Sequence, residues 1–221
     1  MANTARGQLI DLSHDIVEGM VTYKGLPGPQ ICDYWSRAAS AANYDDGATF
    51  QIGRIDMVAN TGTYLDTPFH RFGDGDDLAG VGIERVAGLP GVLVASLDMA
   101  IDVAAFAGID VAGKAVLVAT GWDRYWGSAA YFDNHPYLTE AAARDLAERG
   151  AALVGIDSHN IDDTRTRTRP VHTILLGAGI PICEHLTRLG TLPPFGFRFT
   201  AAPPKIVGMG TFAVRAFAEL G

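Results

Sequence analysis

The chain has 221 residues, of which 48% are apolar and 19% are charged, and its formal net charge is -8 at pH 7. The apolar fraction excludes an intrinsically disordered chain, and the acidic balance argues against a protein that binds nucleic acid through clustered Lys and Arg. Because no apolar run approaches the ~20 residues that span a bilayer and no apolar leader opens the sequence, we expect one cytoplasmic domain over residues 1–221 that has no membrane partner.

The first half of the chain predicts strands joined by loops. Residues 8–16 (QLIDLSHDI) and 50–58 (FQIGRIDMV) alternate apolar and polar positions, as strands of an antiparallel or mixed sheet do. A loop rich in Gly and Pro, residues 24–30, lies between them. Residues 91–121 then hold an apolar run, a short Ala-rich helical stretch and a second apolar run. This order predicts a βαβ unit.

The second half predicts one capped helix and several further strands. Thr139 is placed to cap a helix that ends before Gly150, and an apolar strand follows over residues 151–157. The last strand is expected within residues 205–220. Together these elements predict an α/β protein with a mixed sheet.

A long segment between the βαβ unit and the capped helix, residues 122–138, is rich in aromatic side chains. We expect it to form an ordered loop, because a mobile linker would expose these rings to water. Such a loop is a candidate wall for a pocket, and the rings are equally suited to a core or a subunit interface. They are Trp122, Tyr125, Trp126, Tyr131 and Phe132.

The segment from Asn60 to His70 concentrates residues suited to chemistry. Asn60, Tyr64, Asp66 and His70 are separated by even numbers of residues, and an extended chain sends side chains at such separations to one face. Pro68 interrupts a continuous strand, so a turn is expected to present His70. The alternative interpretation is a strand followed by a turn that carries an ordinary surface histidine.

His172 and Glu184 form a second candidate group with Asp66. Imidazole and carboxylate are ordinary ligands of zinc or manganese, and three such ligands leave a coordination position open. The alternative is a hydrogen-bonded histidine beside an exposed glutamate. The sequence contains no GxSxG, P-loop or GxGxxG motif, which argues against serine hydrolases and nucleotide-binding enzymes.

Arg165, Arg167 and Arg169 form the one basic cluster and alternate with threonines. Two interpretations remain open, namely a solvated loop and a clamp for a substrate carboxylate. The acidic residues just before the cluster favour the solvated loop.

Several blocks of the sequence, in this order, resemble landmarks of the cyclase family, which includes kynurenine formamidase and isatin hydrolase. The blocks are DLSHDIVEGM, NTGTYLDTPFH, TGWDRYWG, YFDNHPYLTEAAARDL, LVGIDS and VHTILLGAGIPICEHL. The resemblance covers nearly the whole chain. It implies a swivelling β/β/α fold with a mixed sheet, a small-molecule substrate that is cyclic or aromatic, and assembly as a homodimer or homotetramer.

The family signature is His-x-Gly-Thr-His-x-Asp-x-Pro-x-His. By this resemblance Asp66, His172 and Glu184 are metal ligands and His70 is the catalytic base. Asn60 and Tyr64 stand where the signature has its two leading histidines. An amide oxygen binds zinc poorly, and a phenol must lose a proton of pKa near 10 to bind well, so the family's metal site should be weakened.

Three functions are compatible with this divergent signature. We favour general acid and base chemistry on a cyclic or aromatic carbonyl compound, through ring closure or a lyase-type proton transfer, with His70 as base and Tyr64 and Asn60 as hydrogen-bond donors. The alternative is a hydrolase of an amide, imide or lactone that uses one zinc or manganese ion at Asp66, His172 and Glu184. The third is a binding protein without catalysis.

Overall fold

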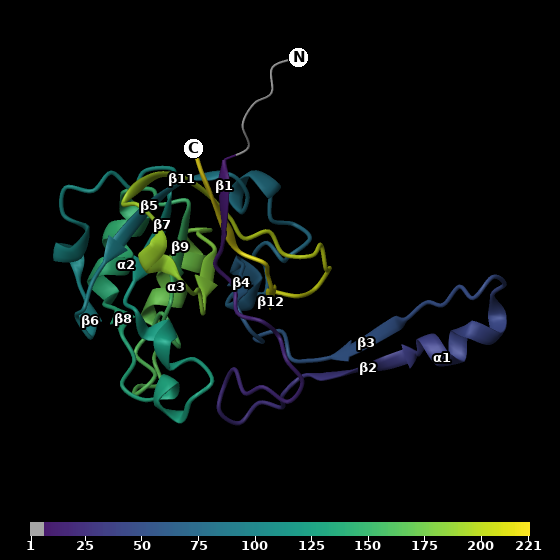
Figure 1. Cartoon of the computed structure of the whole chain (residues 1–221). Helices are drawn as coiled ribbons and strands as arrows, with labels where there is room; N and C mark the ends of the chain where they lie inside the picture. Colours follow the sequence, from purple (N-terminus) through teal and green to yellow (C-terminus); the bar gives the residue numbers. More distant parts are fainter. Residues whose placement is uncertain (1–6) are drawn as a thin grey trace, which may run out of the picture.

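The computed structural model describes residues 7–221, and nine strands of this part form one mixed sheet. Its order is β1-β13-β11-β5-β7-β9-β10-β4-β12. The neighbours β5, β7, β9 and β10 run parallel, and the outer pairs are antiparallel (Figure 1). The strands are β1 Gln8–Asp11, β4 Tyr64–Asp66, β5 Leu89–Ala95, β7 Ala115–Ala119, β9 Leu153–Ile156, β10 Ile182–Glu184, β11 Phe195–Thr200, β12 Thr211–Ala213 and β13 Phe217–Leu220.

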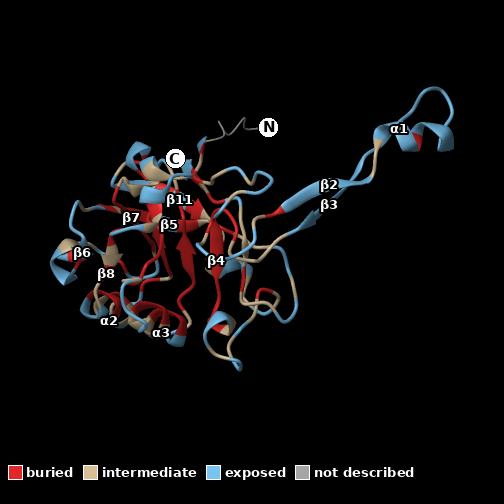
Figure 2. Cartoon of the chain, turned by 90° about the horizontal axis from the view of Figure 1, so that it is seen from below, coloured by how far each residue is buried: buried red, intermediate tan, exposed pale blue. Residues whose placement is uncertain are grey.

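Both faces of the sheet are buried against apolar side chains. Helices α2 (Glu140–Glu148) and α3 (Pro170–Gly177) contribute to the core on one face, together with alternate residues of β5, β7 and β9. The second core lies on the other face and includes Leu65, Leu117 and Phe199. Figure 2 shows these central strands as the most buried part of the molecule. The predicted α/β class with a mixed sheet is confirmed.

Short 3-10 helices and one small sheet form much of the remaining structure. β6 (Ala100–Ile101) and β8 (Tyr137–Leu138) pair in parallel. The 3-10 helices are η1 Ala41–Asn43, η2 Pro68–His70, η3 Ile83–Arg85, η4 Val103–Phe106, η5 Trp122–Tyr125, η6 Ala129–Phe132 and η7 Leu189–Thr191.

The predicted βαβ unit exists with one correction. β5 and β7 pair in parallel, but the segment between them forms the 3-10 helix η4 instead of an α-helix. Gly108 adopts a φ of 73° soon after η4, which ends the turn before an α-helix can develop. The predicted cap is confirmed, because the Thr139 side chain accepts a hydrogen bond from the Ala142 amide at the start of α2.

The predicted closing strand is in fact two strands with different partners. β12 pairs with β4, whereas β13 lies between β1 and β11. The chain changes partner between Val214, whose amide donates to the Thr63 carbonyl, and Ala216, whose carbonyl accepts from Leu12. This crossing brings Thr211 beside β4.

A long arm projects from the body of the molecule (Figures 1 and 2). It consists of an antiparallel pair, β2 (Gln30–Trp35) and β3 (Ile52–Asp56), and helix α1 (Arg37–Ser40) near its tip. The predicted strand over residues 50–58 therefore lies in this arm and not in the main sheet. Ile31 and Ile55 are paired across the arm and are 39% and 50% exposed. The arm thus carries apolar side chains without a core of its own.

None of the helices in residues 7–221 combines the length and the apolar character that crossing a membrane requires.

Candidate active site

Strand register brings four polar side chains to one face of the sheet. Tyr64 lies opposite Glu184 in the β4–β10 pair, and Asp66 lies opposite Thr211 in the β4–β12 pair. Residues two apart on a strand share a face, so Tyr64 and Asp66 point the same way. All four side chains are buried. His172, from the first turn of α3, approaches the same face.

A cleft of about 960 Å³ opens above this group. Its lining includes five of the six residues that the sequence singled out, and the sixth, Asp66, is fully buried at its base. The volume falls within the range of small-molecule sites. The lining residues among the predicted set are Asn60, Tyr64, His70, His172 and Glu184.

Thr211 links Asp66 to His70. The Thr211 hydroxyl donates to Asp66 Oδ1, and its oxygen lies 2.7 Å from His70 Nδ1. A hydroxyl carries one hydrogen, so both bonds form when His70 donates from Nδ1, which leaves Nε2 as a proton acceptor. The His70 side chain is 36% exposed. The network therefore gives His70 the tautomer that a general base requires.

Asp66 is a carboxylate held in its charged form. Burial acts to raise its pKa, but contacts with His172, His70 and Thr211 together bring the pKa below its ordinary value. Its Oδ2 atom is buried and has no hydrogen-bond partner among residues 7–221. Buried carboxylate oxygens rarely remain unpartnered, which indicates a site for a ligand.

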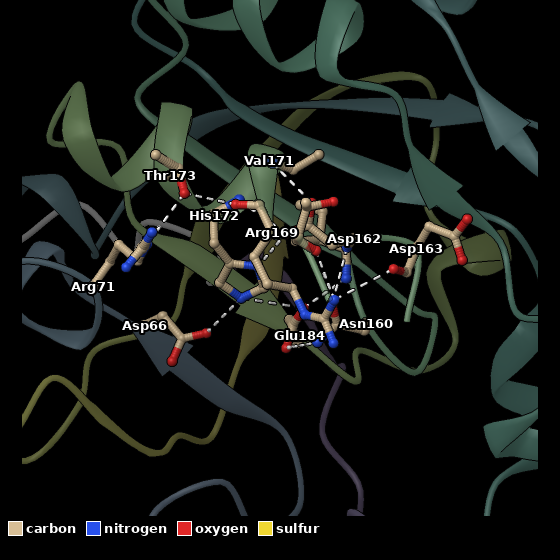
Figure 3. Close-up of polar contacts among 12 residues, drawn as sticks. Asp66, Arg71, Asn160, Asp162, Asp163, Arg169, Val171, His172, Thr173 and Glu184 are labelled. Atoms are coloured by element: carbon tan, nitrogen blue, oxygen red, sulfur yellow. Dashed lines mark hydrogen bonds and ion pairs between the residues drawn. The ribbon is translucent and has the colours of Figure 1, made fainter. Parts of the chain in front are cut away.

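Asp162 orients His172 and also caps its helix. One Asp162 oxygen accepts from the Val171 amide at 2.8 Å, and the other accepts from the His172 amide at 3.1 Å and lies 2.6 Å from His172 Nδ1. His172 Nε2 is thereby directed to Asp66 Oδ2 at 3.7 Å and Glu184 Oε1 at 3.8 Å (Figure 3). Burial acts to lower the pKa of His172, but the surrounding carboxylates raise it to about 10.

Glu184 is fixed at both oxygens. Oε1 accepts from the Ile161 amide at 2.6 Å, and Oε2 accepts from the Tyr64 hydroxyl at 2.5 Å. Burial raises the pKa of Glu184 to about 7 against the opposing charge of His172. Burial, with the charge of Glu184, raises the pKa of Tyr64 well above its ordinary value, so Tyr64 is a neutral donor. Tyr64 could donate a hydrogen bond to a substrate only after its hydrogen bond to Glu184 had been broken.

The residues present fit one divalent ion. Asp66, His70 and His172 each offer a ligand atom, and these atoms lie within 4.8 Å of one another. Two imidazoles and a carboxylate are a known ligand set for catalytic metals. The ligand set predicted from the sequence has Glu184 in place of His70. Glu184 Oε1 lies 3.8 Å from His172 Nε2, and Asp66 Oδ2 lies 3.7 Å from the same nitrogen. The orphaned Asp66 oxygen is the structural feature that supports the fit.

The aromatic loop over residues 122–138 does not form a wall of the cleft. Its rings pack inward, with Trp126 stacked on His14 at 3.9 Å between ring centroids and Tyr131 fully buried. The wall interpretation is therefore wrong for these rings. Tyr131 is buried as the core interpretation expects, and the other four rings are half-buried. Tyr23, which the sequence analysis did not single out, lines the cleft with Tyr64.

Three histidines outside the candidate set each have a buried ring nitrogen without a hydrogen-bond partner among residues 7–221. His159 and His185 are buried and His14 is half-buried. Burial lowers the pKa of His14 and of His185 to about 4 and that of His159 to about 2. These rings therefore stay neutral at physiological pH.

Asp162 and Thr211 are two further site residues that the sequence analysis missed. Asp162 lies ten residues before His172 in a loop, and Thr211 lies 141 residues after His70. Neither position belongs to a local motif. For Asp162, a signal was available in the helix that starts at Pro170 and needs a side-chain cap.

Comparisons with known proteins point to one family. A family described as "Putative cyclase" matches residues 10–163. Kynurenine formamidase from Geobacillus thermodenitrificans is 27% identical over 209 residues, which cover 94% of this chain and 95% of that protein. Kynurenine formamidase from Salinibacter ruber is 29% identical over 94% of this chain and 95% of its own length.

Solved structures agree with the sequence matches. A potential metal-dependent hydrolase with cyclase activity superposes with a TM-score of 0.78 at 27% identity and covers 96% of both chains. Isatin hydrolase A from Ralstonia solanacearum superposes with a TM-score of 0.80 at 22% identity, over 97% of this chain and 92% of that one. This second likeness is one of fold.

Proposed function

The chain belongs to the cyclase family and is an enzyme, and from this premise we propose that it is a hydrolase that opens a C–N or C–O bond in a small amide, imide or lactone. One observation carries the proposal. A buried carboxylate oxygen of Asp66, which has no hydrogen-bond partner among residues 7–221, faces Nε2 of His172 at 3.7 Å beside the cleft. The name of the relatives that match 94% of the chain, kynurenine formamidase, supports bond opening.

Asp66, His172 and Glu184 would hold one zinc or manganese ion. Such an ion supplies Lewis acidity to a carbonyl oxygen and acidity to water. Within residues 7–221, Glu184 Oε1 accepts one hydrogen bond, from the Ile161 amide, so it retains a lone pair for a ligand. Tyr64 fixes the Glu184 carboxylate from the other oxygen. Tyr64 thus supports the site in a position where the family signature has a histidine.

His70 would move the proton. The chain from Asp66 through Thr211 to His70 Nδ1 holds the ring and leaves Nε2 to accept a proton from the attacking water and to return it to the leaving group. Asn60 lines the cleft and offers an amide donor to the oxygen on which charge develops.

Ring closure, which the sequence analysis favoured, has no specific support from the relatives. The relatives from Geobacillus thermodenitrificans and Salinibacter ruber carry the name of an enzyme that opens a C–N bond, and the one solved structure described with cyclase activity is also described as a hydrolase. The Tyr64 hydroxyl that ring closure was to use donates to Glu184. Bond opening is therefore placed first.

We also propose that the protein is a homodimer joined through the arm. A two-stranded hairpin is marginally stable alone, and an interface of standard size takes about 20 to 30 residues from each side, which the arm can supply. Ile31→Lys combined with Ile55→Lys should convert the dimer to monomers in sedimentation experiments. Val207→Lys, at an exposed apolar residue outside the arm, is the matched control and should leave the dimer intact. A wild-type protein that sediments as a monomer would contradict this assembly.

The function is tested with pairs of compounds, each pair being a cyclic substrate and its ring-opened product. Purified protein should hydrolyse an aromatic formamide or a cyclic imide, lose this activity in a chelator and regain it when zinc or manganese is added. Full activity after complete removal of metal would contradict the metal-dependent hydrolase. Faster formation of the ring than its opening, at equal substrate concentration, would support the alternative reaction.

A further inference from the structure

The mouth of the cleft carries positive charge on a protein of net charge -8. Among the cations that line it, Lys24 forms an ion pair with Asp133 at 2.9 Å, and Arg144 pairs with Glu140 at 2.6 Å. These two are already neutralised. The remaining cations are Arg71, Arg167 and Arg169.

The three arginines of the loop after Asp163 have different surroundings. Arg165 pairs with Asp163 at 2.9 Å and does not line the cleft. Arg169 donates from one nitrogen to the carbonyls of Thr166 and Thr168, so it holds the loop together. Arg167 lines the cleft and has no hydrogen bond or ion pair with any described residue. Among the described residues of this loop, Arg167 is thus the cleft-lining arginine whose guanidinium makes no bond within the protein.

Arg71 supplies a second guanidinium from another element. It follows η2, the turn that carries His70, and its Nε atom donates to Thr173 Oγ1 at 3.1 Å. This bond anchors the side chain at the cleft, as Figure 3 shows. Its two terminal nitrogens have no partner within residues 7–221. Arg71, through its two terminal nitrogens, and Arg167 thus both offer N–H donors to the cleft that His70 and His172 line.

The chemistry of the anion follows from the adjacent helix. Phosphate groups commonly bind the free amides of a helix N-terminus. At α3 these amides are occupied, because those of Val171 and His172 donate to Asp162, and Pro170 has none. Guanidinium groups alone remain, and their planar pairs of N–H donors match a carboxylate.

We propose that Arg71 and Arg167 bind a carboxylate on the substrate, so that the enzyme acts on an amide, imide or lactone that bears an acid group. The inference rests on the proposed hydrolase function, since the carbonyl to be attacked lies at Asp66 and His172 while the acid group lies at the mouth. The clamp fixes one end of the substrate and steers anions into the cleft of an otherwise acidic protein.

The test measures binding apart from turnover. Calorimetry of the full chain compares 2-acetamidobenzoate, its neutral methyl ester and phenyl phosphate, in the presence of a chelator so that no ion attracts the anion. Charge-assisted bonds of this kind correspond to about 10-fold to 100-fold in affinity. The acid should bind more tightly than the ester by that factor. Arg167→Gln should reduce the difference, because Arg71 alone remains to bind the carboxylate, and should leave the binding of the ester unchanged.

Arg165→Gln is the matched control, two residues away on the same loop, and should change neither affinity. Equal binding of acid and ester by the wild type, or equal effects of the two variants, would overturn the clamp. Tighter binding of phenyl phosphate than of the acid would overturn the assignment to a carboxylate. Selective binding without hydrolysis of any acid-bearing amide would refute the proposed function and leave the clamp intact. Hydrolysis of the acid and the ester at equal kcat/KM would refute the clamp and leave the proposed function intact.

Discussion

Asp162 offers the sharpest perturbation of the site, because one fully buried carboxylate both caps α3 and orients His172. Asp162→Asn keeps the shape of the side chain and removes its charge. An amide oxygen can still accept one backbone N–H, but the NH2 group that replaces the other oxygen cannot accept from His172. The variant therefore leaves His172 without its charged partner.

The expected loss is set by the cost of breaking a buried ion pair. Removal of one partner from such a pair costs roughly 3 to 5 kcal/mol, and the bond that asparagine retains places Asp162→Asn near the lower end, at about 3 kcal/mol. Loss of the group that orients a metal-binding histidine lowers metal affinity by about 10-fold to 100-fold. Both effects should appear in the same variant.

Urea denaturation followed by circular dichroism measures the free energy of unfolding, and calorimetry measures the affinity for zinc. The neighbouring Asp163→Asn is the matched control, since Asp163 pairs with the exposed Arg165 at the surface. It should produce only a small fraction of either effect. Equal losses of stability in the two variants would refute the role assigned to Asp162, as would unchanged zinc affinity in Asp162→Asn.

Other consequences follow from the buried groups. Tyr64→Phe leaves one oxygen of Glu184 nearly unpartnered and should lower the free energy of unfolding by about 1 to 3 kcal/mol and reduce turnover; a variant with wild-type stability and turnover would show that the hydroxyl has no role. His14 has a folded pKa of about 4, below its unfolded value of 6.5, because of its burial. The unfolded chain therefore takes up this proton first as the pH falls, and stability declines from about pH 6.5 to about pH 4. His14→Phe should make this decline shallower in urea titrations, and curves of equal slope would contradict it.

The residues of the site were predictable where they share a local motif. Even spacing on an extended segment placed Tyr64 and Asp66 on one face, and the structure confirms this because both belong to β4. The helix capped by Thr139 was also predictable, since its cap lies within the same short segment.

Contacts between residues far apart in the sequence could not be predicted from a local sequence pattern. Thr211 reaches Asp66 because the chain changes partner after β12, and no local periodicity encodes that crossing. For a related reason, the sequence pattern did not predict that the strand within residues 50–58 lies in a projecting arm. Its strand β3 alternates as a half-buried strand does, yet all five of its residues are exposed in the isolated chain.

The metal content of three proteins tests the central claim most directly. Wild type, Asp66→Asn and His70→Ala are loaded with zinc, dialysed and measured by mass spectrometry, and their hydrolytic turnover is recorded in parallel. The account predicts one ion per chain in the wild type, none in Asp66→Asn, and one in His70→Ala together with a loss of kcat of about 100-fold or more. Loss of the ion from His70→Ala would make His70 a ligand instead of the base, and a wild type that binds no ion yet remains active would contradict the account.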